Sequence, residues 1–333
     1  MIRFLIVWCM VGLVTPLQVE PAQPQQALTP VRSWSAPDPV AKQSPNDAAM
    51  QPLPVGQMPP GSMQGAGQPV DLNAAQNSQP LHVTEVGQVR LRRRIPDRLV
   101  VLTFDDAPVT QALYAAPILH KYHFGATFYI CEFPPNFSDK TKYMSWEQIQ
   151  HLYKMGFEIG NHTAFHTHVS RMSRKQFEDS LAYIEEKCKS YGIPKPVTFA
   201  YPGYDARSKD LDVLTERGYI FARAGLELTY DPLKDNPLLV PGFNANGTDP
   251  DHVTDVIKQA HDGKIVVLTF HGIPDYEHPW VTTPPELFAR YMQFLHKNRY
   301  KVIAMRDLAR YVDPSTSLQI EPLANSMSAA PKR

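Results

Sequence analysis

Residues 99–106, LVVLTFDD, join six residues typical of a buried strand to two adjacent carboxylates, Asp105 and Asp106. A short apolar run without alternation is typical of a strand that is covered on both faces, as strands of parallel sheets are. The carboxylates come where this strand ends, and successive side chains diverge there. One carboxylate can therefore bind a metal ion while its neighbour stays free.

Similar short runs alternate with helical periodicity from residue 92 to residue 313, which favours a parallel βα architecture. Strands are predicted at 99–104, 126–130, 157–160, 198–201, 220–223, 265–270 and 301–304. Helices are predicted at 110–122, 146–155, 173–192, 210–217, 251–261, 285–298 and 306–312. Ser173 and Gln176 have the spacing of a capping box at the start of the third helix. We expect an α/β fold, a distorted (β/α) barrel of about seven parallel strands, with its chemistry at the carboxyl ends of the strands.

The amino-acid composition further restricts the kinds of partner and metal site that the protein can have. The chain has 333 residues, 43% of them apolar, and 33 basic residues balance 33 acidic ones. This balance lacks the positive field that nucleic-acid binding requires, so no nucleic-acid partner is expected. The 3 cysteines form no C-x-x-C pair, which excludes a disulfide scaffold and thiolate zinc modules. Any metal must be held by His and carboxylate, and two buried thiols are favoured over a disulfide between Cys131 and Cys188.

The two ends of the chain differ from its centre in composition and in predicted structure. Arg3 precedes an apolar run, residues 4–14, which is long enough for a signal peptide and too short for a free-standing membrane span. We expect a signal peptide at 1–22, cleaved near Ala22 or retained as a short anchor, and no helix that spans a membrane. Residues 23–91 are a Pro- and Gln-rich linker and 314–333 a tail, both predicted to be disordered. The catalytic domain would then be exported to the periplasm, the cell wall or the medium.

His162 and His166 are four residues apart, which on a helical turn puts two imidazoles within reach of one ion. Alone this spacing is weak evidence, and the Glu of the H-E-x-x-H motif is absent. Together with one Asp of the adjacent pair, the two imidazoles leave open positions for water and substrate, as a catalytic metal site requires.

Four motifs in this order resemble those of the NodB-like polysaccharide deacetylases, carbohydrate esterase family 4: TFDD at 103–106, HTAFH at 162–166, FAYPG at 199–203 and LTFH at 268–271. The resemblance covers residues 99–312. It implies a metal-dependent hydrolase that removes acetyl groups from an N-acetylated or O-acetylated polysaccharide, and it makes an acetylated glycan the expected partner. A hydrolase of a small non-peptide amide and a non-catalytic glycan-binding protein are the alternatives, and the oligomeric state is left open.

The resemblance also assigns roles. Asp106, His162 and His166 would hold a divalent metal, zinc with cobalt or nickel as alternatives, while Asp105 would be the general base that takes a proton from water. His271 would be the general acid that protonates the leaving group. The backbone N–H of Gly203 or Tyr204 would stabilise the oxyanion.

The sequence departs from the family pattern at several positions. Ala200 stands where many relatives carry an Arg that pairs with the catalytic Asp, so Arg223 is our candidate for orienting Asp105, with a structural strand-end Arg as the alternative. Ala107 replaces the usual Gly. No clear match to the fourth motif is found, so the group that orients His271 is unassigned.

Substrate contacts are predicted from aromatic residues near these motifs. Tyr201 and Tyr204 would stack on a sugar, or else pack within the protein. Trp280 or Tyr276 would contact the glycan from the loop that follows His271. His168 is expected to point away from the site.

Overall fold

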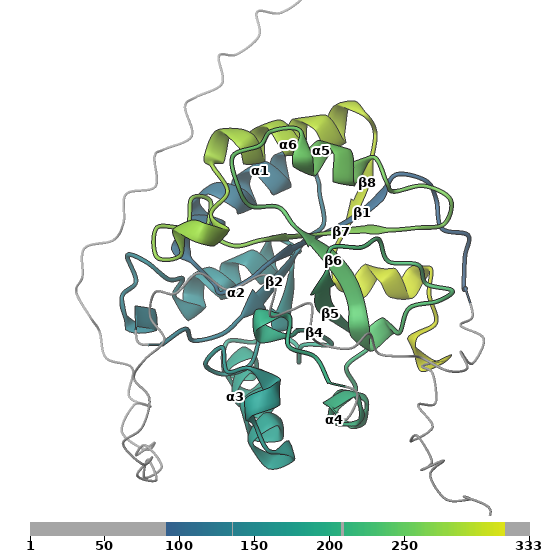
Figure 1. Cartoon of the computed structure of the whole chain (residues 1–333). Coiled ribbons are helices and arrows are strands. Elements are labelled where there is room, and N and C mark those ends of the chain that lie inside the picture. The colour runs from purple at the N-terminus through teal and green to yellow at the C-terminus, as the bar shows by residue number, and fades with distance from the viewer. Residues whose placement is uncertain (1–90, 135, 208–209, 317–333) are drawn as a thin grey trace, which may run out of the picture. The chain divides into compact units, whose positions relative to one another are not determined.

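The computed structural model describes residues 91–134, 136–207 and 210–316 (Figure 1). The predicted signal peptide, nearly all of the predicted linker and most of the predicted tail lie outside these residues. Across the described part of the chain, no helix combines the length and the apolar character needed to cross a membrane.

Eight parallel strands form the sheet, and seven of them close into a ring. The strands are β1 (Leu99–Phe104), β2 (Thr127–Ile130), β3 (Glu158–Asn161), β4 (Thr198–Ala200), β5 (Phe221–Leu226), β6 (Val240–Asn244), β7 (Val266–Phe270) and β8 (Lys301–Ile303). β1 pairs with β7 on one edge, from Val100 to Phe104. On its other edge it pairs with β8 over residues 99–101 and with β2 at Thr103 and Phe104. The barrel therefore closes only where the carboxyl end of β1 meets the amino end of β2, and the expected fold is confirmed.

The composition of the ring differs from the sequence prediction. β6 was not predicted, because Pro241 and Gly242 interrupt its apolar pattern, and such residues argue against an interior strand. The predicted strand at 301–304 exists as β8 but pairs only with β1, outside the ring. The predicted number of strands in the ring is correct, with β6 in place of β8.

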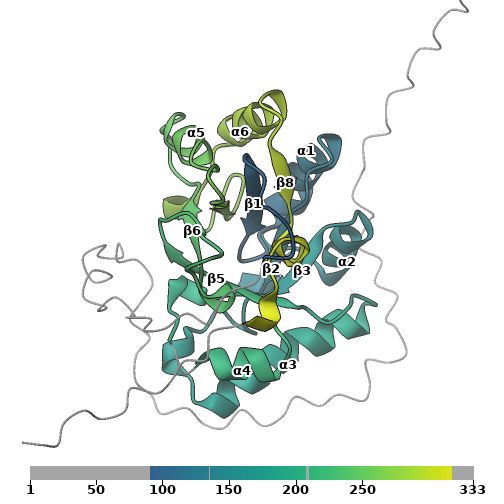
Figure 2. The ribbon, with the colours of Figure 1, turned by 90° about the vertical axis from the view of Figure 1, so that its right-hand side faces the viewer.

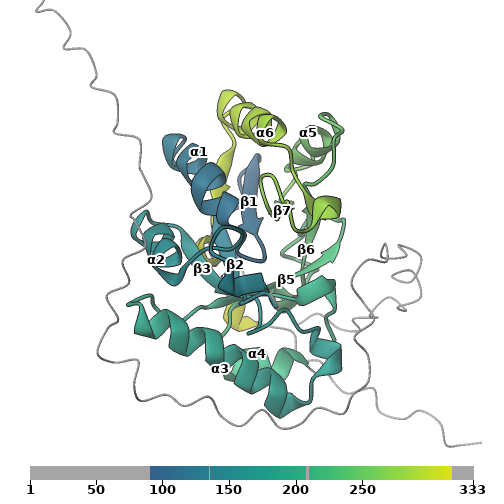
Figure 3. The ribbon, with the colours of Figure 1, turned by 90° about the vertical axis from the view of Figure 1, so that its left-hand side faces the viewer.

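Helices surround the barrel, with α1, α5 and α6 on one side and α3 and α4 on the opposite side (Figure 2 and Figure 3). They are α1 (Ala116–Lys121), α2 (Trp146–Lys154), α3 (Arg174–Ser190), α4 (Leu211–Glu216), α5 (His252–Ile257) and α6 (Pro285–Lys297). The capping box of Ser173 and Gln176 is confirmed at the start of α3. Two predicted helices take other forms: the one at 110–122 begins with a π-helical turn, Gln111–Ala115, and the one at 306–312 is a 3-10 helix, Met305–Arg310.

Stacked phenylalanines join the barrel to α6. The ring of Phe104 on β1 lies 4.8 Å from that of Phe128 on β2 and 5.3 Å from that of Phe270 on β7, and Phe288 of α6 packs edge-on against this stack. Because Phe104 faces the helices, the alternation along the strand turns the next side chain, Asp105, toward the barrel interior.

Candidate active site

The carboxyl ends of the strands bring the predicted polar residues to one edge of the barrel. Asp105 follows β1 and its N–H donates to the carbonyl of Phe270 at 2.9 Å, while the N–H of His162, after β3, donates to Ile130 at 3.1 Å. His271 follows β7 directly. The ladder hydrogen bonds thus continue one residue beyond the strands and fix the main chain at these positions.

Asp106, His162 and His166 form a cluster that could hold a metal ion, since one ligand atom from each lies within 4.8 Å of the others. Oδ1 of Asp106 is 3.3 Å from Nε2 of His162 and 3.5 Å from Nε2 of His166. Nδ1 of His162 lies 2.8 Å from the carbonyl oxygen of Ala200. A carbonyl can only accept, so Nδ1 carries the proton and Nε2 presents its lone pair to the cluster. One carboxylate and two imidazoles suit zinc and related divalent ions.

The backbone that joins the two imidazoles differs from the expectation. Residues 162–166 form an irregular turn instead of a helical one, with Thr163 at φ 64° and His166 at φ 54°. The side chain of Asn161 accepts from the N–H of Thr163 at 3.0 Å, and Ser180 of α3 accepts from Ala164 at 2.8 Å. The helical premise was wrong, but the turn still brings both imidazoles to Asp106.

The surroundings of Asp106 and His166 favour the protonation states in which these side chains can bind a metal ion. Burial would raise the pKa of Asp106, but the imidazoles of His166, His162 and His271 around it hold that pKa far below its usual range. Burial lowers the pKa of His166 to about 4, against the opposing pull of Asp106, so this imidazole is neutral at neutral pH. The thiol of Cys131 lies 3.9 Å from Oδ1 of Asp106, and burial beside the two carboxylates raises its pKa, which keeps it protonated.

Asp105 takes part in a different interaction from that of its neighbour. Arg223 of β5 is fully buried and its Nη2 donates to Oδ2 of Asp105 across the barrel. The guanidinium lies between the rings of Tyr129, at 5.8 Å, and Tyr204, at 5.1 Å. Within the described residues, Oδ1 of Asp105 is buried and has no hydrogen-bond partner. Arg223 therefore contacts Asp105, and its orienting role stays a prediction.

His271 faces the same cluster, with its Nε2 3.9 Å from Oδ2 of Asp106. The side chain of Gln111 donates to the carbonyl of Asp105 at 2.5 Å and to that of His271 at 3.2 Å, so it ties the ends of β1 and β7 together. Sequence reasoning missed Gln111, because a Gln inside a predicted helix gives no signal for a main-chain contact outside that helix.

The turn at 202–204 holds the predicted oxyanion donors. The N–H of Tyr204 already donates to the carbonyl of Tyr201 at 3.0 Å, which favours the N–H of Gly203 for this role. Gly203 has a φ of 61°, and a Cβ there would lie 2.4 Å from Cε1 of His168. His168 was expected to point away from the site, but its ring packs against this turn, where Asp205 lies 3.5 Å from its Nδ1.

The predicted aromatic contacts fall into two groups. Tyr201 is fully buried and donates to the carbonyl of Leu238 at 3.1 Å, so its ring packs within the protein and is not accessible to a sugar. Tyr204 is half-buried over Arg223 and donates to Asn244. Trp280 and Tyr276 are 64% and 78% exposed in the loop after β7. Cys131 and Cys188 are both buried and free, as the thiol alternative predicted.

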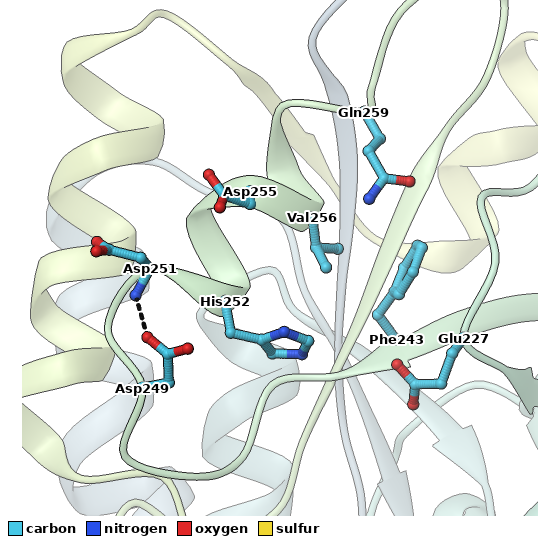
Figure 4. Close-up of a pocket in the computed structure, with 8 residues that line it drawn as sticks. All are labelled: Glu227, Phe243, Asp249, Asp251, His252, Asp255, Val256 and Gln259. Atoms are coloured by element: carbon cyan, nitrogen blue, oxygen red, sulfur yellow. Dashed lines mark hydrogen bonds between the residues drawn. The ribbon is translucent and has the colours of Figure 1, made fainter.

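A hollow of about 530 Å³ lies between β5, β6 and α5 (Figure 4). None of the predicted site residues lines it. Most of its carboxylates have partners: Asp251 pairs with Arg290 at 3.0 Å, Asp255 pairs with Lys258 at 2.7 Å, and Glu227 accepts from Asn244 at 2.8 Å. This hollow is separate from the Asp–His–His cluster.

The site is thus an Asp–His–His cluster that could hold a metal ion, beside an Arg-paired carboxylate at the carboxyl-end edge of a closed parallel barrel. Residues 92–222 match the family model of the polysaccharide deacetylases. The predicted resemblance to the NodB-like deacetylases of carbohydrate esterase family 4 is thereby confirmed.

Three individual proteins are similar to this chain. The chain is 24% identical over 216 residues to a peptidoglycan-N-acetylglucosamine deacetylase of Bacillus cereus, an alignment that covers 65% of this chain and 90% of the relative. A crystal structure from Mycobacterium smegmatis, assigned to the polysaccharide deacetylases, superposes with a TM-score of 0.50 at 13% identity and covers 73% of this chain and 100% of that one. A family 4 carbohydrate esterase of Streptomyces lividans gives a TM-score of 0.43 at 15% identity, covering 62% of this chain and 91% of that one.

Proposed function

We propose that this protein is a metal-dependent deacetylase that hydrolyses acetyl groups of an N-acetylated polysaccharide. The observation that carries the proposal is the separation of two adjacent carboxylates. Asp106 faces two imidazoles, while Asp105 is held by Arg223 and keeps one buried oxygen without a partner. The family supports acetyl hydrolysis, and the similarity to an enzyme named for N-acetylglucosamine supports the amide over the ester.

Asp106, His162 and His166 would hold the divalent ion, and their donor set favours zinc. When bound, such an ion supplies the charge that acidifies a water molecule and polarises the acetyl carbonyl.

The other residues orient groups and move protons. Arg223 orients Asp105 through Oδ2, which leaves Oδ1 to take the proton of the attacking water. The N–H of Gly203 would donate to the developing oxyanion, a contact worth about 3 kcal/mol in comparable sites. His271, on the far side of Asp106, would give its proton to the leaving amine as the C–N bond breaks.

The proposal that the enzyme is exported rests on the signal-like residues 1–22 of the sequence alone. In that case its substrate is an extracellular or cell-wall glycan, a class that includes peptidoglycan.

The separation of roles can be tested with two variants. We expect Asp105→Asn to lower acetate release by about 10²- to 10⁴-fold while metal content is retained, because only the base is lost. We expect His162→Ala to lower both acetate release and metal content, because a metal ligand is lost. Acetate release from chitin oligomers, peptidoglycan and acetylxylan, with elemental analysis of the purified proteins, measures both quantities.

Asp262→Asn is the matched control, because Asp262 is an exposed carboxylate before the amino end of β7. It should change neither acetate release nor metal content. Chelation should abolish activity and added zinc or cobalt should restore it. Equal loss of metal in Asp105→Asn and His162→Ala would contradict the proposed roles.

A further inference from the structure

Two loops form one wall beside the candidate active site. One follows β2 and comprises residues 131–134 and 136–145, and the other follows β7 and comprises residues 271–284. Glu277 of the second loop pairs with Lys142 of the first at 2.9 Å and accepts from Asn136 at 3.3 Å. These contacts hold the two loops together at the carboxyl edge of the barrel.

Four rings line this wall in a continuous row, which we call the ring row: His166, Phe133, His278 and Trp280. The centroid of Phe133 is 4.8 Å from that of His166 and 4.7 Å from that of His278, and His278 is 5.4 Å from Trp280. The row thus runs from a candidate metal ligand to an indole that is 64% exposed. It provides an aromatic surface from the reacting centre to the outside.

His278 is held in this row by a buried carboxylate. Asp275 is 3% exposed and accepts from the N–H groups of Gly272, Glu277 and His278, at 3.0, 3.1 and 2.8 Å. Its Oδ1 lies 3.4 Å from Nδ1 of His278. A Cβ at Gly272 would come within 2.5 Å of Cα of Asp275, so the tight turn needs a glycine there.

With Nδ1 directed at Asp275, Nε2 is the nitrogen left for another partner. The side chain of His278 is 14% exposed, so such a partner can reach it. The proposed hydrolysis assigns no task to His278 or Asp275, although both lie a few residues beyond the candidate acid His271. An oriented imidazole between two aromatic rings can bind a molecule that has both a polar rim and an apolar face.

We propose that the ring row is a glycan subsite, in which Trp280 stacks on the sugar next to the one being deacetylated and His278 hydrogen-bonds to that sugar through Nε2. Sugars have hydroxyl rims and C–H faces, which suit a fixed polar group beside aromatic surfaces. The subsite rests on the proposed function, and it means that the enzyme acts better on oligomers than on single sugars.

The charges on the wall indicate a neutral sugar. Asp275 lies beside His278, and Glu277 is paired with Lys142, so neither pair leaves an excess positive charge for an acidic sugar along the row. A chain of N-acetylated amino sugars without acidic substituents meets this requirement.

The experiment compares kcat/KM for the hexamer and for the monomer of N-acetylglucosamine, using the full chain with added zinc. In the unmodified protein we expect the hexamer to be the better substrate. His278→Ala and Trp280→Ala should each lower the hexamer-to-monomer ratio roughly tenfold, through KM, as expected for one lost hydrogen bond or one lost stacking contact. Trp280→Phe should recover part of the ratio. Because Trp280 is exposed, its replacement does not endanger the fold.

His261→Ala is the matched control, because His261 also pairs with an aspartate, Asp262 at 2.8 Å, but lies before the amino end of β7. This variant should leave the hexamer-to-monomer ratio of kcat/KM unchanged. A hexamer-to-monomer ratio that is unchanged in both His278→Ala and Trp280→Ala would overturn the subsite, as would equal losses on both substrates.

Binding separates this proposal from the proposed function. Calorimetric titration of Asp105→Asn with the hexamer should give a Kd that rises about tenfold when His278→Ala is added. If no glycan is hydrolysed but this difference in Kd is found, the subsite stands and the deacetylase proposal fails. If the hexamer does not bind, or if its Kd is unchanged, the subsite is overturned.

Discussion

At the scale of the residue, part of the backbone strain of the described residues lies at the candidate site. Five non-glycine residues there have a left-handed backbone: Asp106, Ala107, Thr163, His166 and Tyr204, with φ between 54° and 70°. Each such residue costs roughly 1–2 kcal/mol, which the surrounding contacts must offset. Ala107 shows this most directly, since the family pattern that the sequence resembles would place a Gly there. The left-handed backbone at Asp106 and Ala107 accompanies the orientation that brings the carboxylate of Asp106 close to the imidazoles of the cluster.

Gly203 provides a test of close packing in the site. In Gly203→Ala the new Cβ meets His168 and the φ of 61° is unfavourable, so we expect the free energy of unfolding to fall by about 1–3 kcal/mol and kcat/KM to fall with it. Adding His168→Ala removes the clash but leaves the strained φ, so the double variant should recover part of both losses. Urea unfolding and acetate release measure the cycle. If the two substitutions add without coupling, the ring of His168 does not control this turn.

The residues of the cluster could be predicted because their motifs are local in the sequence: an Asp pair after a strand, and two His four residues apart. Arg223 was predicted from the absence of an Arg at position 200. Gln111 and the Asp275–His278 pair could not be predicted in the same way, because their contacts depend on how loops after distant strands meet. The position of Tyr201 in the core likewise depends on packing that the motif does not reveal.

At the scale of the element, a buried carboxylate at the amino ends of the strands joins three strands to the segment after β8. Glu158, the first residue of β3, accepts from Thr127 of β2 at 2.6 Å and from Thr198 of β4 at 2.8 Å. It also accepts from the N–H of Arg306 at 2.8 Å. The amino end of a barrel generally serves stability, and this group lies at the end opposite the candidate site.

Glu158→Ala should lower the free energy of unfolding by about 2–4 kcal/mol, because buried donors lose their acceptor. Glu158→Gln keeps an acceptor for Thr127 and Arg306 and can donate to Thr198, so it should cost less than about 1 kcal/mol. Urea unfolding of the three proteins measures the difference. A large loss in Glu158→Gln would show that the negative charge itself is required.

The unmodified protein and Glu158→Gln should differ in how their free energies of unfolding depend on pH. Burial raises the pKa of Glu158, against the opposing hydrogen bonds of Thr127, Arg306 and Thr198. The folded protein therefore keeps this proton to a higher pH than the unfolded chain, whose pKa is near 4.5, and the resulting stability is lost as pH rises through the folded pKa. Relative to the unmodified protein, Glu158→Gln should gain stability as pH rises above about 4.5, since it has no proton to lose.

The elements themselves were mostly predictable, since apolar runs and helical periodicity identified the long strands and α2, α3 and α6. The exceptions have local causes. β6 carries Pro and Gly in its interior, and the π-helical turn before α1 has the same apolar spacing as an ordinary helix. Closure of the ring through β6 rather than β8 depends on pairing between distant segments, which periodicity does not specify.

At the scale of the whole molecule, the two ends of the described domain meet. Leu91 pairs with Val312 in an antiparallel bridge, the N–H of Arg92 donates to Tyr311 at 2.7 Å, and the Arg92 guanidinium pairs with Asp313 at 3.0 Å. Ile95 is buried in the cluster that also contains Leu308 and Val312. Residues 91–98 therefore belong to the folded domain, although they precede the first strand.

A chain of residues 91–316 should fold cooperatively, with a free energy of unfolding within about 1 kcal/mol of the full chain, because the segments it lacks are predicted to be a signal peptide, a linker and a tail. A chain of residues 99–316 should be less stable by at least about 2 kcal/mol, since it loses the burial of Ile95 as well as the pairing at Leu91. Urea unfolding compares the three chains, and acetate release from the shorter two shows whether the barrel retains its site. Equal stability of the two shortened chains would mean that the contacts of residues 91–98 with the end of the domain contribute nothing. A large loss on removing residues 1–90 alone would show that part of the predicted linker belongs to the domain.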